Sequence, residues 1–268
     1  MKIFVEGVGV LGPGLNGWQT SLSVLAGTAP YLEAELIIPP NDLLPSAERR
    51  RTGLPVRIAL AVGCEAIANA QRNASELPAV FASSAADGEN MHNIFETLAA
   101  NGCQVSPTRF HNSVHNAPSG YWSIATKSMA ASTSLACYDA SFAAGLIEAA
   151  TQVCAHQKVH EKAVVLIAYD TPYPQPLHAA RPIGTSFGVS LVLGNKQTLG
   201  SLGALEINIL RNRTASTSIA DARLEALRVG TPAARSLPLL AAIAARAPSK
   251  IYLDYLGGNQ LEVLLRPC

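Results

Sequence analysis

Residues 132–150 read STSLACYDASFAAGLIEAA, and this stretch joins a strand to a helix through a single cysteine. Small and β-branched residues over 130–136 favour a strand, and the apolar spacing over 138–157 favours an amphipathic helix. Cys137 lies between them, at the start of the helix. Backbone N–H groups and the helix dipole lower the pKa of a thiol in such a position, so Cys137 is a candidate nucleophile.

Strands and helices alternate on both sides of this stretch. The further strand segments are 77–84, 162–170 and 187–195, and the helical ones are 55–71 and 88–102. Residues 162–170 are apolar almost throughout, as in a strand buried on both faces. The alternation predicts an α/β fold whose sheet is covered by helices on both sides.

The composition narrows the classes of partner. The chain has 268 residues, of which 49% are hydrophobic and 15% charged, with a net charge of +1. This is enough apolar material for a sizeable core, and it argues against a nucleic-acid or membrane-surface partner. No apolar run is long enough to span a membrane, and residues 1–12 lack the pattern of a signal peptide. The five cysteines are widely spaced and odd in number, so we expect a reduced compartment, the cytoplasm.

Gly7, Gly9 and Gly12 match the spacing of the dinucleotide-binding fingerprint. That fingerprint needs a helix that opens at the glycines, so that the helix N-terminus meets a pyrophosphate. Pro13 and Gly14 follow instead, and the next helical pattern starts only near residue 16. A turn that needs glycine is therefore the preferred interpretation, and no nucleotide cofactor is expected.

Two pairs of histidines have the spacing of zinc ligands on a helix, His111 with His115 and His156 with His160. A zinc site needs at least a third ligand, and no glutamate stands where a metalloprotease would have one. The first pair lies in a segment broken by Asn and Pro, and the second lies at an expected helix end. We therefore expect no metal site.

Cys137 needs a base if it is to act as a nucleophile. The alternative is that Cys137 is simply a small buried hydrophobic residue, which is the commoner role of a free cysteine. All six histidines lie at or before His178, so a mechanism in which a histidine of residues 179–268 activates this thiol is excluded.

Six segments, taken in order, resemble the N-terminal half of a β-ketoacyl synthase, a condensing enzyme of the thiolase fold. They are VEGVGVLGPGLNGWQTSLSVLAG, RIALAVGCEAIANA, AVFASSAADG, SPTRFHNSVHNAPSGYWSIA, STSLACYDASFAAGLIEA and RPIGTSFGVSLVLG. Within them Asn116, Gly120, Ser123, Ile124, Gly184, Gly188 and Leu193 match family positions, and Ala136-Cys137 falls on the Ala-Cys of the nucleophile elbow. Each motif alone is weak, but their common order makes chance similarity improbable.

The resemblance implies a thiolase-like α/β fold, layered α/β/α, with a reduced C-terminal part. It covers residues 1–195, which are expected to form the synthase-like domain. Residues 196–268 are then expected to be a short α/β extension packed on that domain. A full synthase carries two catalytic histidines in its C-terminal half, and residues 196–268 contain no histidine at all.

This departure from the family pattern implies a subunit with no condensing activity of its own, because no group in residues 196–268 replaces the imidazoles that stabilise the enolate and the oxyanion. The chain looks most like the chain-length-factor subunit of aryl-polyene and related pigment pathways. Such a subunit pairs with a full-length β-ketoacyl synthase as a heterodimer and shapes the acyl pocket of that partner. Acyl carrier protein is a further expected partner, and no cofactor is implied.

The candidate site follows from segment position within the resemblance. Dimers of the thiolase fold form across the strand before the nucleophile helix and across the segment upstream of it, here residues 128–136 and 107–122. The residues expected to line the shared pocket or interface are Phe110, His111, Val114, His115 and Tyr138. No catalytic residue is expected, and Cys137 is interpreted as an inactive thiol in a packed interface.

Two other functions stay open from the sequence. One is an independent acyltransferase or thioesterase in which His111 or His115 activates Cys137. The other is a homodimeric scaffold or binding module that keeps the fold without a synthase partner. Acylation of the purified chain would favour the first, and failure to co-purify with a neighbouring ketosynthase would favour the second.

Overall fold

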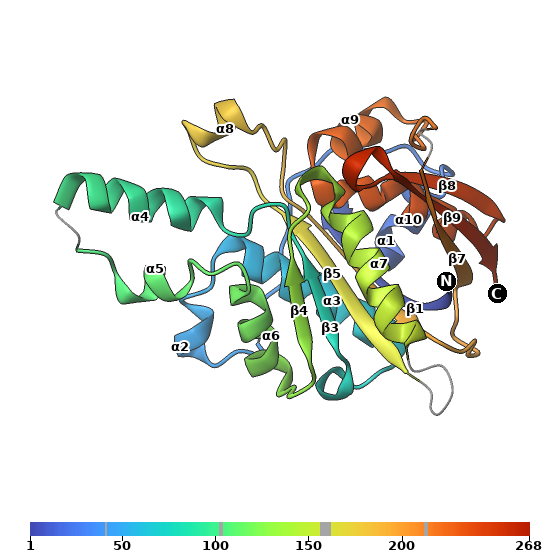
Figure 1. The fold of residues 1–268 in the computed structure, drawn as a ribbon, viewed down its shortest axis with the longest axis horizontal. Coiled ribbons are helices and arrows are strands. Elements are labelled where there is room, and N and C mark those ends of the chain that lie inside the picture. Colours follow the sequence, from blue (N-terminus) through green and yellow to red (C-terminus); the bar gives the residue numbers. More distant parts are fainter. Residues whose placement is uncertain (41, 102–103, 156–161, 212–213) are drawn as a thin grey trace.

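One mixed sheet organises the chain in the computed structural model, which describes residues 1–40, 42–101, 104–155, 162–211 and 214–268 (Figure 1). Within those residues the strand order is β4-β3-β5-β6-β1-β7-β9-β8, with the short β2 paired to β1. The strands are β1 Lys2–Gly12, β2 Leu15–Asn16, β3 Ala79–Ala82, β4 Ser132–Leu135, β5 Ala163–Asp170, β6 Phe187–Gly194, β7 Gly203–Leu210, β8 Ser249–Asp254 and β9 Gln260–Pro267. The expected strands are therefore present, and β5 and β6 are buried at every position.

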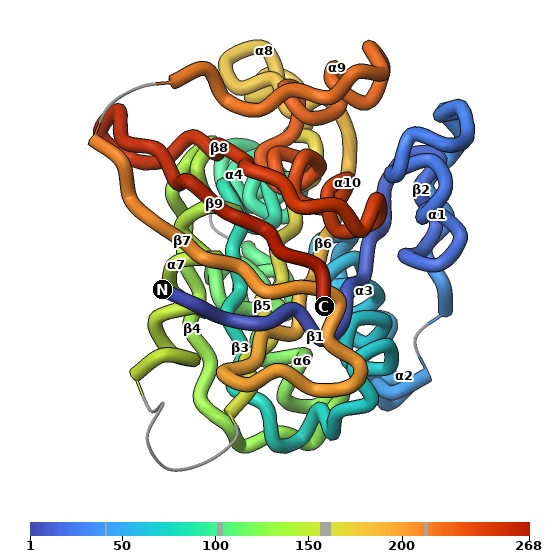
Figure 2. The backbone as a smooth tube through the Cα atoms, turned by 90° about the vertical axis from the view of Figure 1, so that its right-hand side faces the viewer, coloured from blue at the N-terminus to red at the C-terminus, as the bar shows by residue number. Residues whose placement is uncertain are grey.

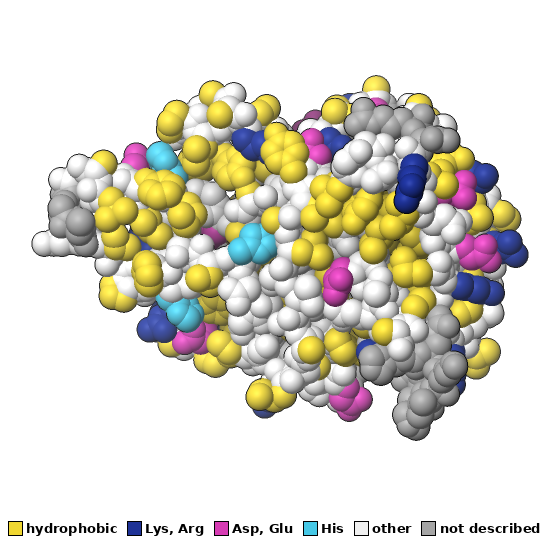
Figure 3. Space-filling view, in the orientation of Figure 1, with side chains coloured by type: hydrophobic (Ala, Val, Ile, Leu, Met, Phe, Trp, Pro, Cys, Tyr) yellow, Lys and Arg dark blue, Asp and Glu magenta, His cyan; other side chains and the backbone are white. Residues whose placement is uncertain are grey.

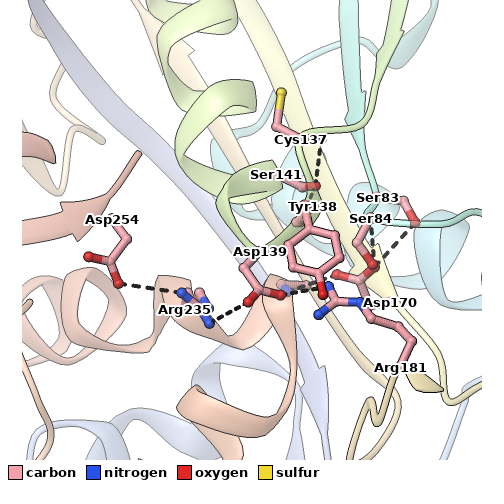
Figure 4. Close-up of polar contacts among 11 residues, drawn as sticks. Ser83, Ser84, Cys137, Tyr138, Asp139, Ser141, Asp170, Arg181, Arg235 and Asp254 are labelled. Atoms are coloured by element: carbon pink, nitrogen blue, oxygen red, sulfur yellow. Dashed lines mark hydrogen bonds and ion pairs between the residues drawn. The ribbon is translucent and has the colours of Figure 1, made fainter. Parts of the chain in front are cut away.

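Strands β3, β4 and β5 run parallel, and this places the candidate site. Ala82, the last residue of β3, pairs with Leu135 of β4 and Ala168 of β5. Because carboxyl ends of parallel strands meet at one edge of the sheet, the residues that follow β3, β4 and β5 lie close together there. Ser83, Cys137 and Asp170 are brought to one edge in this way, although they are far apart in the sequence (Figure 4).

Helices cover both faces of the sheet, as expected for an α/β fold. Helices α3 Leu54–Ala70 and α6 Ala117–Thr126 lie on one face, where the edge of the Trp122 ring meets Phe81 at a centroid distance of 6.2 Å. Helices α1 Trp18–Leu25, α7 Ser141–Cys154 and α10 Leu237–Ala245 lie on the other. Each face thus has its own hydrophobic core, with the sheet between them.

Gly7 and Gly9 lie inside β1 and not in a turn, so the turn interpretation is wrong for them. A Cβ on Gly7 would lie 2.2 Å from the Ala66 carbonyl oxygen, and one on Gly9 would lie 2.1 Å from that of Val62. Glycine is needed here because helix α3 packs its backbone directly on β1. Helix α1 begins only at Trp18, so no helix opens at these glycines.

The C-terminal segment, defined here as residues 203–267, extends the same sheet. Strand β7 pairs with β1, with Lys2 opposite Glu206, and β9 and β8 follow in order. Figure 2 shows β7 running beside β1 and β9 running beside β7. The segment also carries α9 Ala222–Gly230 and the short 3-10 helix η3 Pro232–Ser236, which packs against α7 and β6. The division into residues 1–195 and 196–268 stays a prediction.

An arm formed by α4 Gly88–Asn101 and α5 Pro107–His111 projects away from the sheet (Figure 1). The remaining elements are α2 Ser46–Arg49, α8 Leu177–Ala180, η1 Ala74–Glu76, η2 Tyr138–Ala140 and η4 Leu256–Gly258. Among the residues described, no helix has the length and apolar character required to cross a bilayer.

Candidate functional site

The turn from β4 into α7, residues 136–141, is called the elbow below. Tyr138 has a φ of 53°, in the left-handed region that a non-glycine residue rarely adopts. The Ser141 side chain holds this turn, because its Oγ accepts a hydrogen bond from the Cys137 N–H at 3.0 Å and donates one to the Tyr138 carbonyl at 2.7 Å (Figure 4). The elbow is therefore a tight, internally bonded turn.

The Cys137 thiol is not activated by this turn. Helix η2 separates Cys137 from the first turn of α7, so the thiol does not lie at the N-terminus of the long helix. Burial raises the pKa of the Cys137 thiol above its ordinary value, which keeps the thiol protonated at neutral pH. The expectation that a helix start lowers this pKa is wrong here. Within the described part of the chain, no hydrogen bond reaches Sγ.

Charged residues join the elbow to distant parts of the chain. Asp139 pairs with Arg181 at 2.6 Å and, through its other oxygen, with Arg235 of η3 at 3.0 Å. Arg235 reaches Asp254 of β8 at 3.4 Å. The Arg181 guanidinium also stacks on the Tyr138 ring, 3.5 Å from its centroid. In Figure 4 the Cys137 thiol points away from this cluster.

No local sequence pattern indicates Arg181, Arg235 or Asp254, since each lies far along the chain from residue 139. Tyr138 is 62% exposed, so its ring lies at the surface beneath Arg181. This arrangement fixes the direction in which the ring points. The salt bridges from Asp139 to Arg181 and Arg235 use the charge of Asp139 to hold distant parts of the chain together.

Three of the predicted pocket residues come together in one groove. Phe110 and His111 of α5 and Val114 of the following loop line an open cavity of about 660 Å³, which is closed on its other side by Tyr121 and Ile124 of α6. We call this the α5–α6 groove. Phe110 is 70% exposed, which is unusual for so large an apolar side chain away from an interface. Figure 3 shows hydrophobic side chains gathered over the arm to which α5 belongs.

His115 and Tyr138 lie outside the α5–α6 groove. The His115 Nε2 lies 3.2 Å from the Ser83 carbonyl oxygen, at the carboxyl end of β3. Tyr138 stacks with Arg181 at the elbow. His111 and His115 thus lie in different surroundings, and the described residues hold no cluster of three or more metal-ligating side chains. His156 and His160 lie outside the described residues.

Strand β4 forms one end of the sheet. Among the described residues β4 pairs with β3 alone, and its side chains range from half-buried to exposed. Met129, shortly before it, is 96% exposed. An unpaired strand edge beside exposed apolar residues is a template for another chain. That residues 107–122 and 128–136 form an interface stays a prediction, and these exposures are consistent with it.

A polar cleft of about 780 Å³ lies beside the groove, and sequence reasoning missed it. Arg50, Arg51 and Arg109 line it together with Asp87 and Tyr173. Burial raises the pKa of Asp87, although the Asn90 N–H, donating to this carboxylate at 2.9 Å, opposes the shift. The cleft therefore presents several cations together with two acids, the partly buried Asp87 and the exposed Glu89.

Comparison with known proteins identifies the same fold. The sequence profile described as "Beta-ketoacyl synthase, N-terminal domain" matches residues 26–247. A solved ketosynthase in complex with its chain length factor from Xenorhabdus doucetiae contains a similar chain, with 21% identity and a TM-score of 0.72, over 98% of this chain and 99% of that one. No curated protein sequence matches the chain.

Two further solved structures are similar over 100% of this chain and 99% of theirs. The ishigamide ketosynthase/chain length factor is 14% identical, with a TM-score of 0.71. A type II polyketide synthase acyl carrier protein in complex with its ketosynthase bound to the hexaketide is 11% identical, with a TM-score of 0.74. At such identities these similarities establish the fold, and the predicted thiolase-like α/β class is confirmed.

Proposed function

This chain belongs to the family of the β-ketoacyl synthase N-terminal domain, and from that premise we propose that it is a non-catalytic, chain-length-factor-like subunit of a heterodimeric β-ketoacyl-[acyl carrier protein] synthase. Its partner is a full-length ketosynthase, which performs the condensation. The pair works in polyketide, aryl-polyene or fatty-acid-type biosynthesis. Acyl carrier protein delivers the substrates to the pair.

The observation that carries the proposal is the state of the elbow. Cys137 occupies the position of the family's nucleophile, yet burial raises the pKa of its thiol and no described histidine bonds to it. A condensing enzyme needs an ionisable thiol and groups that stabilise developing negative charge. Residues 196–268 contain no histidine to supply them. A chain with this fold and this elbow is suited to support the chemistry of a partner.

The surface around β4 and α5 supports a partner of the same fold. Among the described residues β4 pairs on one side only, so its outer edge offers backbone N–H and C=O groups to a second strand. Phe110 and Val114, respectively 70% and 51% exposed, offer apolar contact in the α5–α6 groove. The chain length factor in the Xenorhabdus doucetiae structure is found with its ketosynthase, which fits this arrangement. Phe110, His111 and Val114 in the α5–α6 groove, with His115 beside Ser83 and Tyr138 at the elbow, shape the shared pocket and limit chain length.

The cytoplasm is the location that this role requires, since the substrates and the carrier protein of such a pair are cytoplasmic. The described cysteines support a reduced compartment. Cys64, Cys137, Cys154 and Cys268 are all free thiols.

Co-expression tests the proposal directly. The chain is produced with the ketosynthase encoded nearest to its own gene, and the pair is purified through a tag on the ketosynthase alone. We expect a one-to-one complex that condenses acyl units on acyl carrier protein. The chain alone should form no product, and incubation of the chain alone with an acyl thioester should leave Cys137 unlabelled. A chain that stays monomeric or self-associates beside the ketosynthase would contradict the proposal.

A further inference from the structure

Asp170, the last residue of β5, is a buried carboxylate with an unusually complete set of donors. It is 2% exposed. Its Oδ1 accepts hydrogen bonds from the Ser84 N–H and hydroxyl, both at 2.8 Å, and from the Ser83 hydroxyl at 3.3 Å. Its Oδ2 accepts one from the Ala233 N–H at 2.9 Å. A buried charge persists only where such donors replace water, so this set marks Asp170 as a fixed junction.

Burial raises the pKa of Asp170 to about 6, and the hydrogen bonds from Ser83, Ser84 and Ala233 oppose that rise. The carboxylate is therefore mainly ionised at neutral pH and able to accept from all of these donors at once. Charge-assisted hydrogen bonds of this kind are stronger than neutral ones. They bind two segments far apart in the sequence, the turn after β3 and helix η3 of the C-terminal segment.

Ser83 connects Asp170 to the surface that we propose faces the ketosynthase. Ser83 is fully buried, and each of its polar atoms has a partner. Its N–H donates to the carbonyl of Leu135, the last residue of the edge strand β4, at 3.2 Å. Its carbonyl oxygen lies 3.2 Å from the His115 Nε2, and its hydroxyl donates to Asp170. Ser83 is thus the point where β4, His115 and Asp170 meet.

Helix η3 holds the other side of the junction. Besides the Ala233 N–H on Asp170, the Arg235 side chain of the same short helix pairs with Asp139 of the elbow. The Ser236 hydroxyl donates to the Ala233 carbonyl at 2.7 Å and stabilises the turn. The C-terminal segment therefore contacts the carboxyl edge of the sheet at two points, through the Ala233 N–H at Asp170 and through the Arg235 guanidinium at Asp139. Figure 4 shows the second contact.

We propose that Asp170 is a positioning residue that couples the C-terminal segment, through Ser83, to the partner-facing loop at His115 and to the end of the edge strand β4. This inference rests on the proposed function, because it names the surface that a ketosynthase contacts. Asp170 itself touches neither the partner nor a substrate. It sets the place of His115, and the C-terminal segment thereby influences an interface that it does not form.

The Asp170→Asn variant tests the coupling. The amide keeps the shape of the carboxylate but replaces one acceptor with a donor, which then faces the Ala233 or Ser84 N–H. In titrations of the folded chain with its ketosynthase, we expect the dissociation constant to rise about tenfold. In the double variant with His115→Gln, the fold-increase in the dissociation constant should be smaller than the product of the two single increases, because both variants disturb the same contact.

Two further variants keep the test decisive. Ser83→Ala removes only the hydroxyl link and should weaken the pair in the same direction, about threefold, and it replaces Asp170→Asn if that variant does not fold. Asp221→Asn is the matched control, because this carboxylate also accepts two backbone N–H groups, at the start of α9, but lies outside the relay. The Asp221→Asn variant should leave the dissociation constant within twofold of that of the unaltered chain.

A measurement on the isolated chain separates this inference from the proposed function. The ring resonances of ¹³C-labelled His115 should shift in Asp170→Asn and stay in place in Asp221→Asn. If the unaltered chain binds no ketosynthase, the proposed function fails, and the His115 resonances still decide the coupling. If the unaltered chain binds but Asp170→Asn changes neither the affinity nor the His115 resonances, or acts independently of His115→Gln, the coupling is overturned and the proposed function stands.

Discussion

Arg235 Nη2 lies 3.0 Å from Asp139 Oδ2, and this contact ties the C-terminal segment to the elbow beside Cys137. Arg181 holds the other oxygen of Asp139 at 2.6 Å. The Asp139 carboxylate is thus clamped between two guanidinium groups from distant parts of the chain.

Removal of this clamp should destabilise the chain. In Arg235→Ala, Asp139 keeps only Arg181 and Asp254 loses its contact, so we expect the free energy of unfolding in urea to fall by about 1–2 kcal/mol. Arg266→Ala is the control, because Arg266 is 71% exposed and its pair with Glu206 is 3.9 Å long. An equal effect of both variants would show that the clamp contributes nothing beyond a surface pair.

Stability should increase as the pH falls through about 6. Burial raises the pKa of Asp170 from 3.8 to about 6 in the folded chain, so folding favours the protonated acid. The stabilisation is fully present below the unfolded value of 3.8 and is lost as the pH rises through about 6. Over that range the change amounts to about 3 kcal/mol for Asp170 alone.

Urea unfolding at pH 5 and at pH 7.5 measures this effect, with Asp170→Asn as the comparison. The variant should reduce the difference between the two pH values. A smaller difference should remain, because burial also raises the pKa of Glu65 and Asp87. Equal pH dependence in the variant and the unaltered chain would mean that Asp170 is not the group that titrates.

Cys137→Ala should leave synthesis by the complete pair within about twofold of the unaltered pair. The thiol is protonated at neutral pH because burial raises its pKa, so it contributes no nucleophile. Product formation by the purified pair is the measurement, with the corresponding cysteine of the ketosynthase replaced as the positive control for loss. Stoichiometric acylation of Cys137 by an acyl thioester would point instead to an independent acyltransferase.

Phe110→Ala should shift the products of the pair toward longer chains. The side chain is 70% exposed and lines the α5–α6 groove, so its removal enlarges the space that we assign to the shared pocket. Mass spectrometry of the released products measures the shift, and His111→Ala is the companion variant. Leu199→Ala is the control, because Leu199 is fully exposed and lines none of the cavities described above. An unchanged product distribution for both groove variants would rule out the gating role.

Gly9→Ala should prevent normal folding or cost about 3 kcal/mol or more. The new Cβ would lie 2.1 Å from the Val62 carbonyl oxygen of α3, and neither backbone can move without disturbing the sheet. Gly120→Ala is the matched control on the exposed side of α6, where nothing lies within 4 Å of the new atom. It should stabilise the chain by up to about 1 kcal/mol. Thermal unfolding of the two variants compares them.

The elements that carry the family motifs were predictable because each has a local signal. The apolar run of β5 indicates a buried strand, and the Ala-rich spacing of residues 55–71 indicates the helix α3. The strand–cysteine–helix pattern of residues 132–150 places the elbow. Gly7 and Gly9 were misinterpreted because a glycine that admits a neighbouring helix looks the same, in sequence, as one that makes a turn.

The candidate site was predictable only in part. Phe110, His111 and Val114 are neighbours along the chain, so a segment-level resemblance could bring them to one groove. His115 belongs to the same segment but faces Ser83, because the chain turns between α5 and α6. Nothing near residue 170 in the sequence indicates that its carboxylate receives the N–H of Ala233.

The sequence by itself determined the α/β class, the order of the motifs and the absence of histidine from residues 179–268, because these depend on local patterns and on residue identity. Only the tertiary structure decided the state of the thiol and the partners of Asp139 and Asp170. The pKa of Cys137 and of Asp170 depends on burial, and the partners of Asp139 and Asp170 come from residues 83, 84, 181, 233 and 235. Parallel strands collect their carboxyl ends at one edge of the sheet, and no local pattern records which distant side chains meet there.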